Sequence, residues 1–227
     1  MYREHWDSFY AQPHADLAEP SPFARDSLSH IAPGSTLFEL GCGNGRDALF
    51  FARHGIRVIA CDQSGVAIQA LRAYLDGSNG FFGTPEFVQS RFRALDDRPG
   101  LDVVYSRFTL HAVDASEASD TLRWAHRNLR PGGTLLIEAR TVHGDLYGVG
   151  EPAGRDAFIH DGHYRRFIRP DELATELLDV GFEINDLTEG RGMALKGADD
   201  PVVVRVNAST PGPVSAEALA IAADSRA

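Results

Sequence analysis

The sequence predicts an α/β fold in which helices cover a mainly parallel β-sheet. Three observations support this prediction. Residues 37–47 have the pattern of a strand, a tight glycine turn and the start of a helix. Short apolar runs alternate with amphipathic stretches from residue 36 to residue 180, which is typical of βαβ units. The last two apolar runs are separated only by residues 188–201, which predicts a closing hairpin.

The elements are expected where apolar periodicity and capping residues agree. Ser21 and Ser64 are the expected N-caps of two helices, and Pro22 takes the first position of one of them. The strands are expected at residues 36–40, 57–61, 86–89, 101–106, 134–139, 182–187 and 202–206. The helices are expected at residues 22–31, 46–54, 66–75, 117–129 and 171–180. Residues 141–168 show no clear period and are interpreted as an insertion.

The composition favours one globular domain. The 227 residues are enough for a sizeable core, and residues 1–207 are interpreted as a single domain followed by an Ala-, Ser- and Pro-rich tail over residues 208–227. The net charge of -10 disfavours a general nucleic-acid-binding surface. No apolar run approaches the ~20 residues that span a bilayer, so membrane insertion is not expected.

The N-terminus and the cysteines indicate the compartment. The first residues are polar and contain no apolar secretory segment. The two cysteines, Cys42 and Cys61, are interpreted as small buried residues of a protein in a reducing compartment. A cytoplasmic protein is therefore expected. The sequence leaves the oligomeric state open, and a homo-oligomer is one alternative.

The turn between the first strand and its helix carries the strongest functional signal. Gly41, Gly43 and Gly45 alternate there, which lets a ligand approach the backbone closely and lets the chain adopt positive φ angles. The following helix directs its N-terminus toward the ligand, which favours negative charge. Glu39 precedes the turn, and Asp62 ends the second strand, where a carboxylate can accept hydrogen bonds from ribose hydroxyls. A turn that binds no ligand is the alternative.

The spacing fits two cofactor classes. The dinucleotide fingerprint G-x-G-x-x-G would require a glycine where the chain has Arg46. The acid-x-G-x-G-x-G form over residues 39–45, followed by Asp62, instead resembles motif I of the class I S-adenosylmethionine-dependent methyltransferases. The run R-P-G-G-T-L-L-I at residues 130–137 resembles the segment that enters the fifth strand of this family. The resemblance implies a Rossmann-like, doubly wound sheet of seven mostly parallel strands with an antiparallel last strand.

The resemblance also implies S-adenosylmethionine as the cofactor. In the family, the glycine turn holds the methionine part, the acid after the second strand holds the ribose, and residues past the third strand lie near the adenine. Residues past the fourth strand face the methionine part and the transferred methyl group. The cofactor contacts expected on this basis are Glu39, Gly41, Cys42, Gly43, Asn44, Gly45, Asp47, Asp62, Gln63, Arg91, Phe92, Ser106 and Arg107. For Phe92 a core position, and for Arg91 a solvated one, are the alternatives.

Two histidines are candidates for a general base. Open α/β sheets bind ligands past the carboxyl ends of their strands, and His143 and His111 each follow such an end. A hydroxyl acceptor is a poor nucleophile until it loses its proton, so a nearby imidazole would assist methyl transfer. His143 is the first choice and His111 the second. A structural, hydrogen-bonded role is the alternative for His111.

Glu138 lies inside an apolar strand, where a carboxylate needs a partner. Arg140 is two residues away on the same face of the strand, which favours an ion pair. A Mg²⁺ site formed by Glu138, His143 and Asp145 is a weaker alternative.

The N-terminal segment and the insertion are the expected acceptor regions. Residues 1–33 carry an aromatic stripe and are interpreted as a helical lid, since leading segments of the family often close the site; packing on the core is the alternative. The insertion is rich in aromatic, histidine and arginine residues, and its arginines Arg165, Arg166 and Arg169 suit a phosphate or carboxylate. The expected acceptor contacts are Trp6, Tyr10, Asp145, Tyr147, His160, His163, Tyr164, Arg165 and Arg166.

The runs P-S-P-F-A at residues 20–24, D-L-Y-G-V-G at residues 145–150 and D-G-H-Y-R-R-F-I at residues 161–168 are similar to segments of bacterial sugar and polysaccharide O-methyltransferases. This looser resemblance implies O-methylation of a sugar or glycan hydroxyl, with a saccharide or another small molecule as the acceptor. An O-, N- or C-methyltransferase acting on a secondary metabolite is the second reading. A protein that binds S-adenosylmethionine without catalysis is the third.

Overall fold

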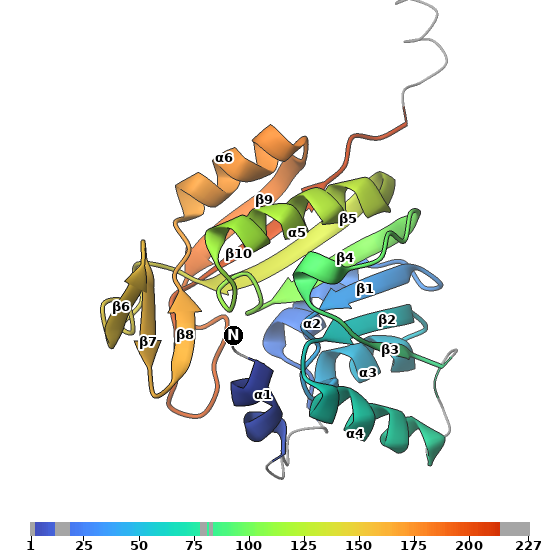
Figure 1. The fold of residues 1–227 in the computed structure, drawn as a ribbon. Helices are drawn as coiled ribbons and strands as arrows, with labels where there is room; N and C mark the ends of the chain where they lie inside the picture. Colours follow the sequence, from blue (N-terminus) through green and yellow to red (C-terminus); the bar gives the residue numbers. More distant parts are fainter. Residues whose placement is uncertain (1–2, 12–18, 78–80, 82–83, 214–227) are drawn as a thin grey trace, which may run out of the picture.

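The computed structural model describes residues 3–11, 19–77, 81 and 84–213. Its main sheet has seven strands in the order β3-β2-β1-β4-β5-β10-β9 (Figure 1). The neighbours from β3 to β5 run parallel, whereas β10 is antiparallel to both β5 and β9. The predicted fold class, including the antiparallel last strand, is confirmed.

Most predicted elements lie within a few residues of their expected bounds. The strands of the main sheet are β1 (Thr36–Leu40), β2 (Arg57–Asp62), β3 (Glu86–Gln89), β4 (Leu101–Arg107), β5 (Leu129–Arg140), β9 (Glu183–Gly190) and β10 (Val203–Ser209). The helices are α1 (Arg3–Tyr10), α2 (Pro22–Ser27), α3 (Arg46–Arg53), α4 (Gly65–Asp76), α5 (Ala115–Asn128) and α6 (Pro170–Val180), with short 3₁₀ turns η1 (Leu28–His30) and η2 (Phe92–Ala94).

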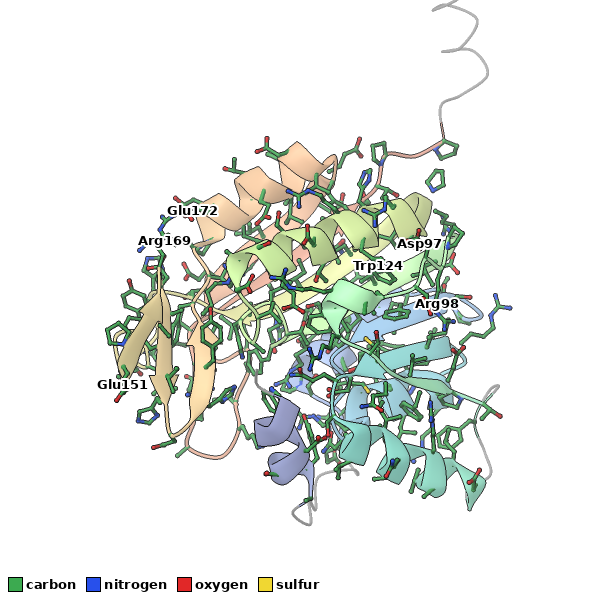
Figure 2. The ribbon with its side chains drawn as sticks, in the orientation of Figure 1. Asp97, Arg98, Trp124, Glu151, Arg169 and Glu172 are labelled. Carbon is green, nitrogen blue, oxygen red and sulfur yellow. The ribbon has the colours of Figure 1, made fainter. Side chains whose placement is uncertain are left out.

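Hydrophobic side chains cover both faces of the sheet, because successive residues of a strand point to opposite faces. In β1, Leu37 packs into the core formed with α2, α3 and α4, whereas Phe38 packs into the core formed with α5 and α6. Figure 1 shows α5 and α6 together on one side of the sheet. On that side, Trp124 of α5 packs against Phe38 and lies near the loop that carries Asp97 (Figure 2). The two cores make the sheet doubly wound.

The carboxylate of Asp47, in the first turn of α3, is a structural anchor. It accepts hydrogen bonds from the Ser21 backbone N–H at 2.7 Å, from the Ser21 hydroxyl at 2.7 Å and from the Tyr105 hydroxyl at 3.0 Å. Ser21 is the N-cap of α2, as predicted, since its hydroxyl oxygen accepts from the Ala24 backbone N–H. Asp47 therefore ties α2 to α3 and β4. The sequence analysis expects Asp47 to contact the cofactor, but among the described residues the hydrogen bonds of its carboxylate all go to Ser21 and Tyr105.

Two boundaries differ from the prediction. β5 begins at Leu129 instead of residue 134, because Leu129 pairs with Leu101 before the chain bulges and pairing resumes at Thr134. β10 continues to Ser209, where it pairs with Thr134 of β5, so residues 208 and 209 belong to the sheet and not to a tail. Residues 214–227 of the predicted tail lie outside the described residues.

The insertion contains a second, three-stranded antiparallel sheet that the sequence analysis did not predict. Its strands are β6 (Glu151–Gly154), β7 (Ala157–His160) and β8 (His163–Arg166). Asp161 and Gly162 form the two-residue connection between β7 and β8, and both have positive φ angles, of 51° and 70°. Asp-Gly is a strong signal for such a hairpin turn. Each strand has only four residues, which is too short for a clear period-two pattern.

The helix α1 lies between α4 and β8 (Figure 1). Its Asp7 carboxylate accepts a hydrogen bond of 2.6 Å from the hydroxyl of Ser64, the residue that caps α4. The ring of Trp6 meets the ring of His163 in β8 edge to face, with centroids 4.9 Å apart. The aromatic stripe therefore joins the main domain to the insertion. Tyr2 and the side chain of Phe9, which belong to the same stripe, lie outside the described residues.

Candidate active site

The glycine turn between β1 and α3 is closely packed from several sides. Gly41, Gly43 and Gly45 have positive φ angles of 68°, 54° and 77°, as the sequence analysis expected. A Cβ atom at Gly41 would lie 2.3 Å from the Thr109 side chain, and one at Gly43 would lie 2.2 Å from the Tyr10 hydroxyl. Both the backbone conformation and the available space therefore require glycine.

Asp62, at the end of β2, braces this turn. The side chain is 7% exposed. One carboxylate oxygen accepts a hydrogen bond of 2.9 Å from the Gly43 N–H, and the other accepts one of 2.8 Å from the Ser64 N–H. Burial raises the pKa of Asp62 although these hydrogen bonds oppose the shift. The carboxylate thereby fixes the positions of the turn and of the α4 N-terminus.

Glu39 is a buried carboxylate whose hydrogen bonding is incomplete. It is 4% exposed, and its Oε2 atom has no hydrogen-bond partner among the described residues. Burial raises its pKa well above the usual range, and the nearby Asp47 adds to the shift. A buried acceptor without a donor is unfavourable, and a bound cation would supply the missing interaction. The ammonium group of an amino acid is a cation of suitable chemistry.

A cleft of about 480 Å³ opens in front of the turn. This volume is within the range of small-molecule sites. Its walls come from the strand ends of the main sheet, the loop after β4, helix α1 and the second sheet. The lining residues include Gly41, Asp62, Gln63, Ser90, Arg91, Phe92, Thr109, Ala112, Val113, Trp6, Tyr10, Ala153 and Tyr164.

The helix α1 closes one side of this cleft. Tyr10 is held above Gly43, and burial together with the carboxylate of Asp62 raises the pKa of the Tyr10 phenol. Trp6 stacks on Tyr10 and also lines the cleft. Of the expected acceptor contacts, Trp6, Tyr10 and Tyr164 therefore lie at the cleft.

Three further residues that the sequence analysis expects at the cofactor make contacts within or next to the turn: Cys42, Asn44 and Ser106. Cys42 is buried, and its N–H donates a hydrogen bond of 2.9 Å to the carbonyl of Cys61. Burial raises the pKa of both thiols. The Asn44 side chain accepts from the Arg46 N–H within the turn, and the hydroxyl of Ser106 hydrogen-bonds that of Thr109 at the end of β4.

His111 is buried beside the loop after β4. It is 5% exposed, and its Nδ1 atom has no hydrogen-bond partner among the described residues. Burial lowers its pKa well below the usual range, and nearby cationic groups, with Arg140 first, add to the shift. The imidazole is therefore neutral near pH 7. Its ring lies 5.2 Å from that of Phe108.

His143 has a different environment. Its side chain is 62% exposed and its Nδ1 atom lies 2.9 Å from Glu189 Oε1. Asp145 is also exposed and pairs with Arg191 at 2.6 Å. Neither residue lines the cleft. In the insertion, the Tyr147 hydroxyl donates to Asp156 and its ring packs against Phe158, while His160 lies opposite His163 across the hairpin.

The expected ion pair between Glu138 and Arg140 is wrong. Glu138 accepts from Arg107 at 3.0 Å and from Arg205 at 2.8 Å. These two arginines are the direct neighbours of Glu138 across β4 and β10, and cross-strand neighbours lie closer than residues two positions apart in one strand. Arg140 pairs instead with Asp199.

The described residues contain no group of three or more histidine, cysteine or acidic side chains that could hold a metal ion. Glu138 is engaged by two guanidinium groups, and His143 and Asp145 each have a partner of their own. The structure thus gives no support to the weak Mg²⁺ candidate.

Phe108 was missed by the sequence analysis. Directly after β4 it has a φ of 57°, which is unusual for a bulky residue and marks local strain. The guanidinium carbons of Arg107 and Arg140 lie 4.4 and 5.5 Å from the centre of its ring. Sequence patterns contain no signal for a phenylalanine in this conformation.

Residues 37–133 match the methyltransferase domain family. A carboxy-S-adenosyl-L-methionine synthase of Pseudomonas fluorescens is 31% identical over 120 residues, which are 50% of this chain and 48% of that protein. A cypemycin N-terminal methyltransferase of Streptomyces is 33% identical over 135 residues, which are 56% of this chain and 53% of that protein. The chain thus spans about half the length of the curated relatives it matches.

A crystal structure of an S-adenosylmethionine-dependent methyltransferase from Methanosarcina mazei has the same fold. The TM-score is 0.72 at 19% identity, over 82% of this chain and 97% of that chain. At this identity the likeness shows that the two chains share a fold. Among the described residues, no helix is both long and apolar enough to cross a membrane.

The contact between Gly43 and Tyr10 can be tested by adding one methyl group. Gly43→Ala should lower the free energy of unfolding by about 2 kcal/mol more than a control, because the new Cβ overlaps the Tyr10 ring. The control is Gly55→Ala, since Gly55 also has a positive φ but has open space around it. The control alone should cost about 1 kcal/mol of backbone strain. Chemical denaturation measures both values.

In the Tyr10→Ala background, Gly43→Ala should cost no more than Gly55→Ala. An equal loss in Gly43→Ala and Gly55→Ala would show that α1 does not pack on the turn as described.

Proposed function

We propose that this chain is an S-adenosylmethionine-dependent methyltransferase whose small acceptor enters the cleft between α1, the loop after β4 and the β6–β8 sheet. The observation that carries the proposal is the buried carboxylate of Glu39 beside a glycine turn that Asp62 braces, since its Oε2 atom has no hydrogen-bond partner in the described part of the chain. A turn without a ligand would leave this acid without a partner. An ammonium group beside the turn gives it one.

The chain's own residues divide the work of holding the cofactor. Glu39 would bind the ammonium group of the methionine part of S-adenosylmethionine. The glycine turn would leave room for the amino-acid atoms of that part. Asp62 would accept hydrogen bonds from the ribose hydroxyls at the edge of the cleft. Phe92 and Arg91, also on the cleft wall, would contact the adenine. When bound, S-adenosylmethionine supplies a methyl group on a sulfonium centre, so the protein mainly has to align the acceptor and exclude water.

Proton removal is the step in which a histidine would take part. His111 is the better candidate, because it is buried, neutral and next to Thr109 and Ala112, which line the cleft. His143 was the first choice from the sequence. Its exposure and its contact with Glu189 make it the weaker candidate.

The proposed acceptor is a small molecule. The O-methylation of a sugar or glycan hydroxyl, which the looser resemblance implied, has no counterpart in the names of the two relatives, one of which is a methyltransferase acting on cypemycin. A secondary-metabolite acceptor therefore becomes the leading reading, and the sugar hydroxyl becomes the alternative. A non-catalytic role would require binding without transfer to any acceptor.

Glu39→Gln should make the affinity for S-adenosylmethionine independent of pH. In the free protein the pKa of Glu39 is raised, and only the ionised carboxylate pairs with an ammonium group. Affinity for S-adenosylmethionine should therefore fall as the pH drops below this raised pKa, and binding near it should release a proton. Isothermal titration calorimetry in buffers of different ionisation enthalpy measures both effects.

The same substitution should stabilise the cofactor-free protein at neutral pH by about 1 kcal/mol, because burial disfavours the ionised form that Glu39 adopts in the unfolded chain at that pH. The gain should vanish at a pH below the unfolded-state pKa of about 4.3, where the acid is protonated in both states. Unchanged affinity together with an unchanged pH profile would contradict the role of Glu39.

The transfer itself can be tested with labelled S-adenosylmethionine and a panel of saccharides, amines, phenols and peptides, with and without EDTA. On any acceptor that is labelled, His111→Asn should reduce turnover by at least about 100-fold if a hydroxyl is methylated, while cofactor affinity persists. His143→Ala should retain near-normal turnover. The reverse result would return the base to His143, and binding without any transfer would favour the non-catalytic reading.

A further inference from the structure

The three arginines that follow Tyr164 have different environments. Arg166 donates hydrogen bonds to the carbonyls of Leu110 and Val113. Arg169 forms a two-pronged pair with Asp156, at 2.8 and 2.9 Å. Arg165, by contrast, makes no hydrogen bond or ion pair with another described side chain, although it is partly buried. A partly buried guanidinium without an acceptor is unfavourable in the free protein.

The surroundings of Arg165 carry charges of both signs: Arg140 opposes its charge, whereas Asp161 and Asp199 favour it without forming an ion pair with it. Burial lowers the pKa of Arg165, and the neighbouring Arg140 contributes in the same direction. Arg140 pairs with Asp199, and Arg107 shares Glu138 with Arg205. Arg165 is thus the arginine of this cluster that has no ion-pair partner among the described residues.

The cluster lies beside the cleft, and Arg165 itself lines a small neighbouring hollow with Phe158 and His160. His163 and Arg165 are two residues apart in β8 and share one face of the strand. His163 contacts Trp6 of α1, and Trp6 lines the cleft. On the same side, His111 is close to Arg140, His163 and Arg165. Its free Nδ1 atom can donate a hydrogen bond if that nitrogen carries the proton.

We propose that Arg165, assisted by His111 and Arg140, binds a carboxylate or phosphate group of the acceptor. The proposal rests on the proposed function and names the chemical class of its substrate. A guanidinium presents a planar fork that matches either anion. The chain as a whole carries a net charge of -10, so it repels anions, and recognition needs a local site of this kind.

The strain at Phe108 fits the same role. The guanidinium groups of Arg107 and Arg140 both lie over its ring, and its φ is 57°. The stacking fixes Arg140 beside Arg165 and limits the freedom that binding would otherwise remove.

Binding of benzoate, phenyl phosphate and the uncharged benzamide tests the proposal. Calorimetry is done on the full chain, both cofactor-free and saturated with S-adenosylhomocysteine. At least one charged probe should bind about tenfold or more tightly than benzamide, because charge-assisted hydrogen bonds to Arg165 are lost with the amide. The probe that binds more tightly distinguishes a carboxylate from a phosphate.

Arg165→Gln should abolish this preference, and Arg155→Gln should keep it. Arg155 is exposed and pairs with Glu172, so it is a matched control. The same preference in Arg165→Gln and in the native chain, or no preference in the native chain, would overturn the proposal. A loss of S-adenosylmethionine affinity in Arg165→Gln without any effect on the probes would also overturn it, by assigning Arg165 to the cofactor.

These outcomes are separate from a failure of the proposed function. If S-adenosylmethionine does not bind the native chain, the proposed function fails, and the probe titrations on cofactor-free protein still decide whether Arg165 forms an anion site. If the cofactor binds and the charged probes show no preference, only the anionic acceptor is wrong.

Discussion

The carboxylate of Asp62 is the constraint on which the site depends. Its two oxygens hold the Gly43 N–H of the turn and the Ser64 N–H at the start of α4. Ser64 in turn donates its hydroxyl to Asp7 of α1. One buried acid therefore positions the glycine turn, the helix after β2 and the helix that covers the cleft. Because Tyr10 of α1 also rests on Gly43, the turn and its cover form one packed unit.

This arrangement places unfavourable groups where a ligand can satisfy them. Glu39 and Asp62 are both buried with raised pKa values, and one oxygen of Glu39 has no hydrogen-bond partner among residues 3–11, 19–77, 81 and 84–213. Phe108 adds backbone strain at the end of β4. The two hydrophobic cores on either side of the sheet supply the stability that tolerates these features. Local unfavourable groups at a functional site are expected when stability is provided elsewhere.

The sequence predicted the main sheet well because its signals are local. The glycine turn, the caps Ser21 and Ser64 and the apolar strands each depend on a few neighbouring residues, and the structure has them as expected. The sequence did not predict the contacts of side chains whose partners come from distant segments. The pairing of Glu138 with Arg107 and Arg205 follows from strand register, which no local pattern specifies.

The candidate site shows the same division between local and distant signals. Gly41, Asp62 and Phe92 could be placed at the cleft from spacing and strand order. The position of His111 beside β8, and the exposure of His143, depend on how the insertion folds back on the loop after β4. The Asp-Gly turn at residues 161 and 162 was the one local signal for that folding, and it was overlooked.

Calorimetry of S-adenosylmethionine binding to the native chain and to Asp62→Ala tests the placement of the cofactor most directly. We expect one site per chain and a loss of affinity of at least about tenfold in Asp62→Ala, because the ribose contact and the brace on Gly43 disappear together. Equal affinity in the two proteins, or no binding to the native chain, would contradict the placement of the cofactor at this turn.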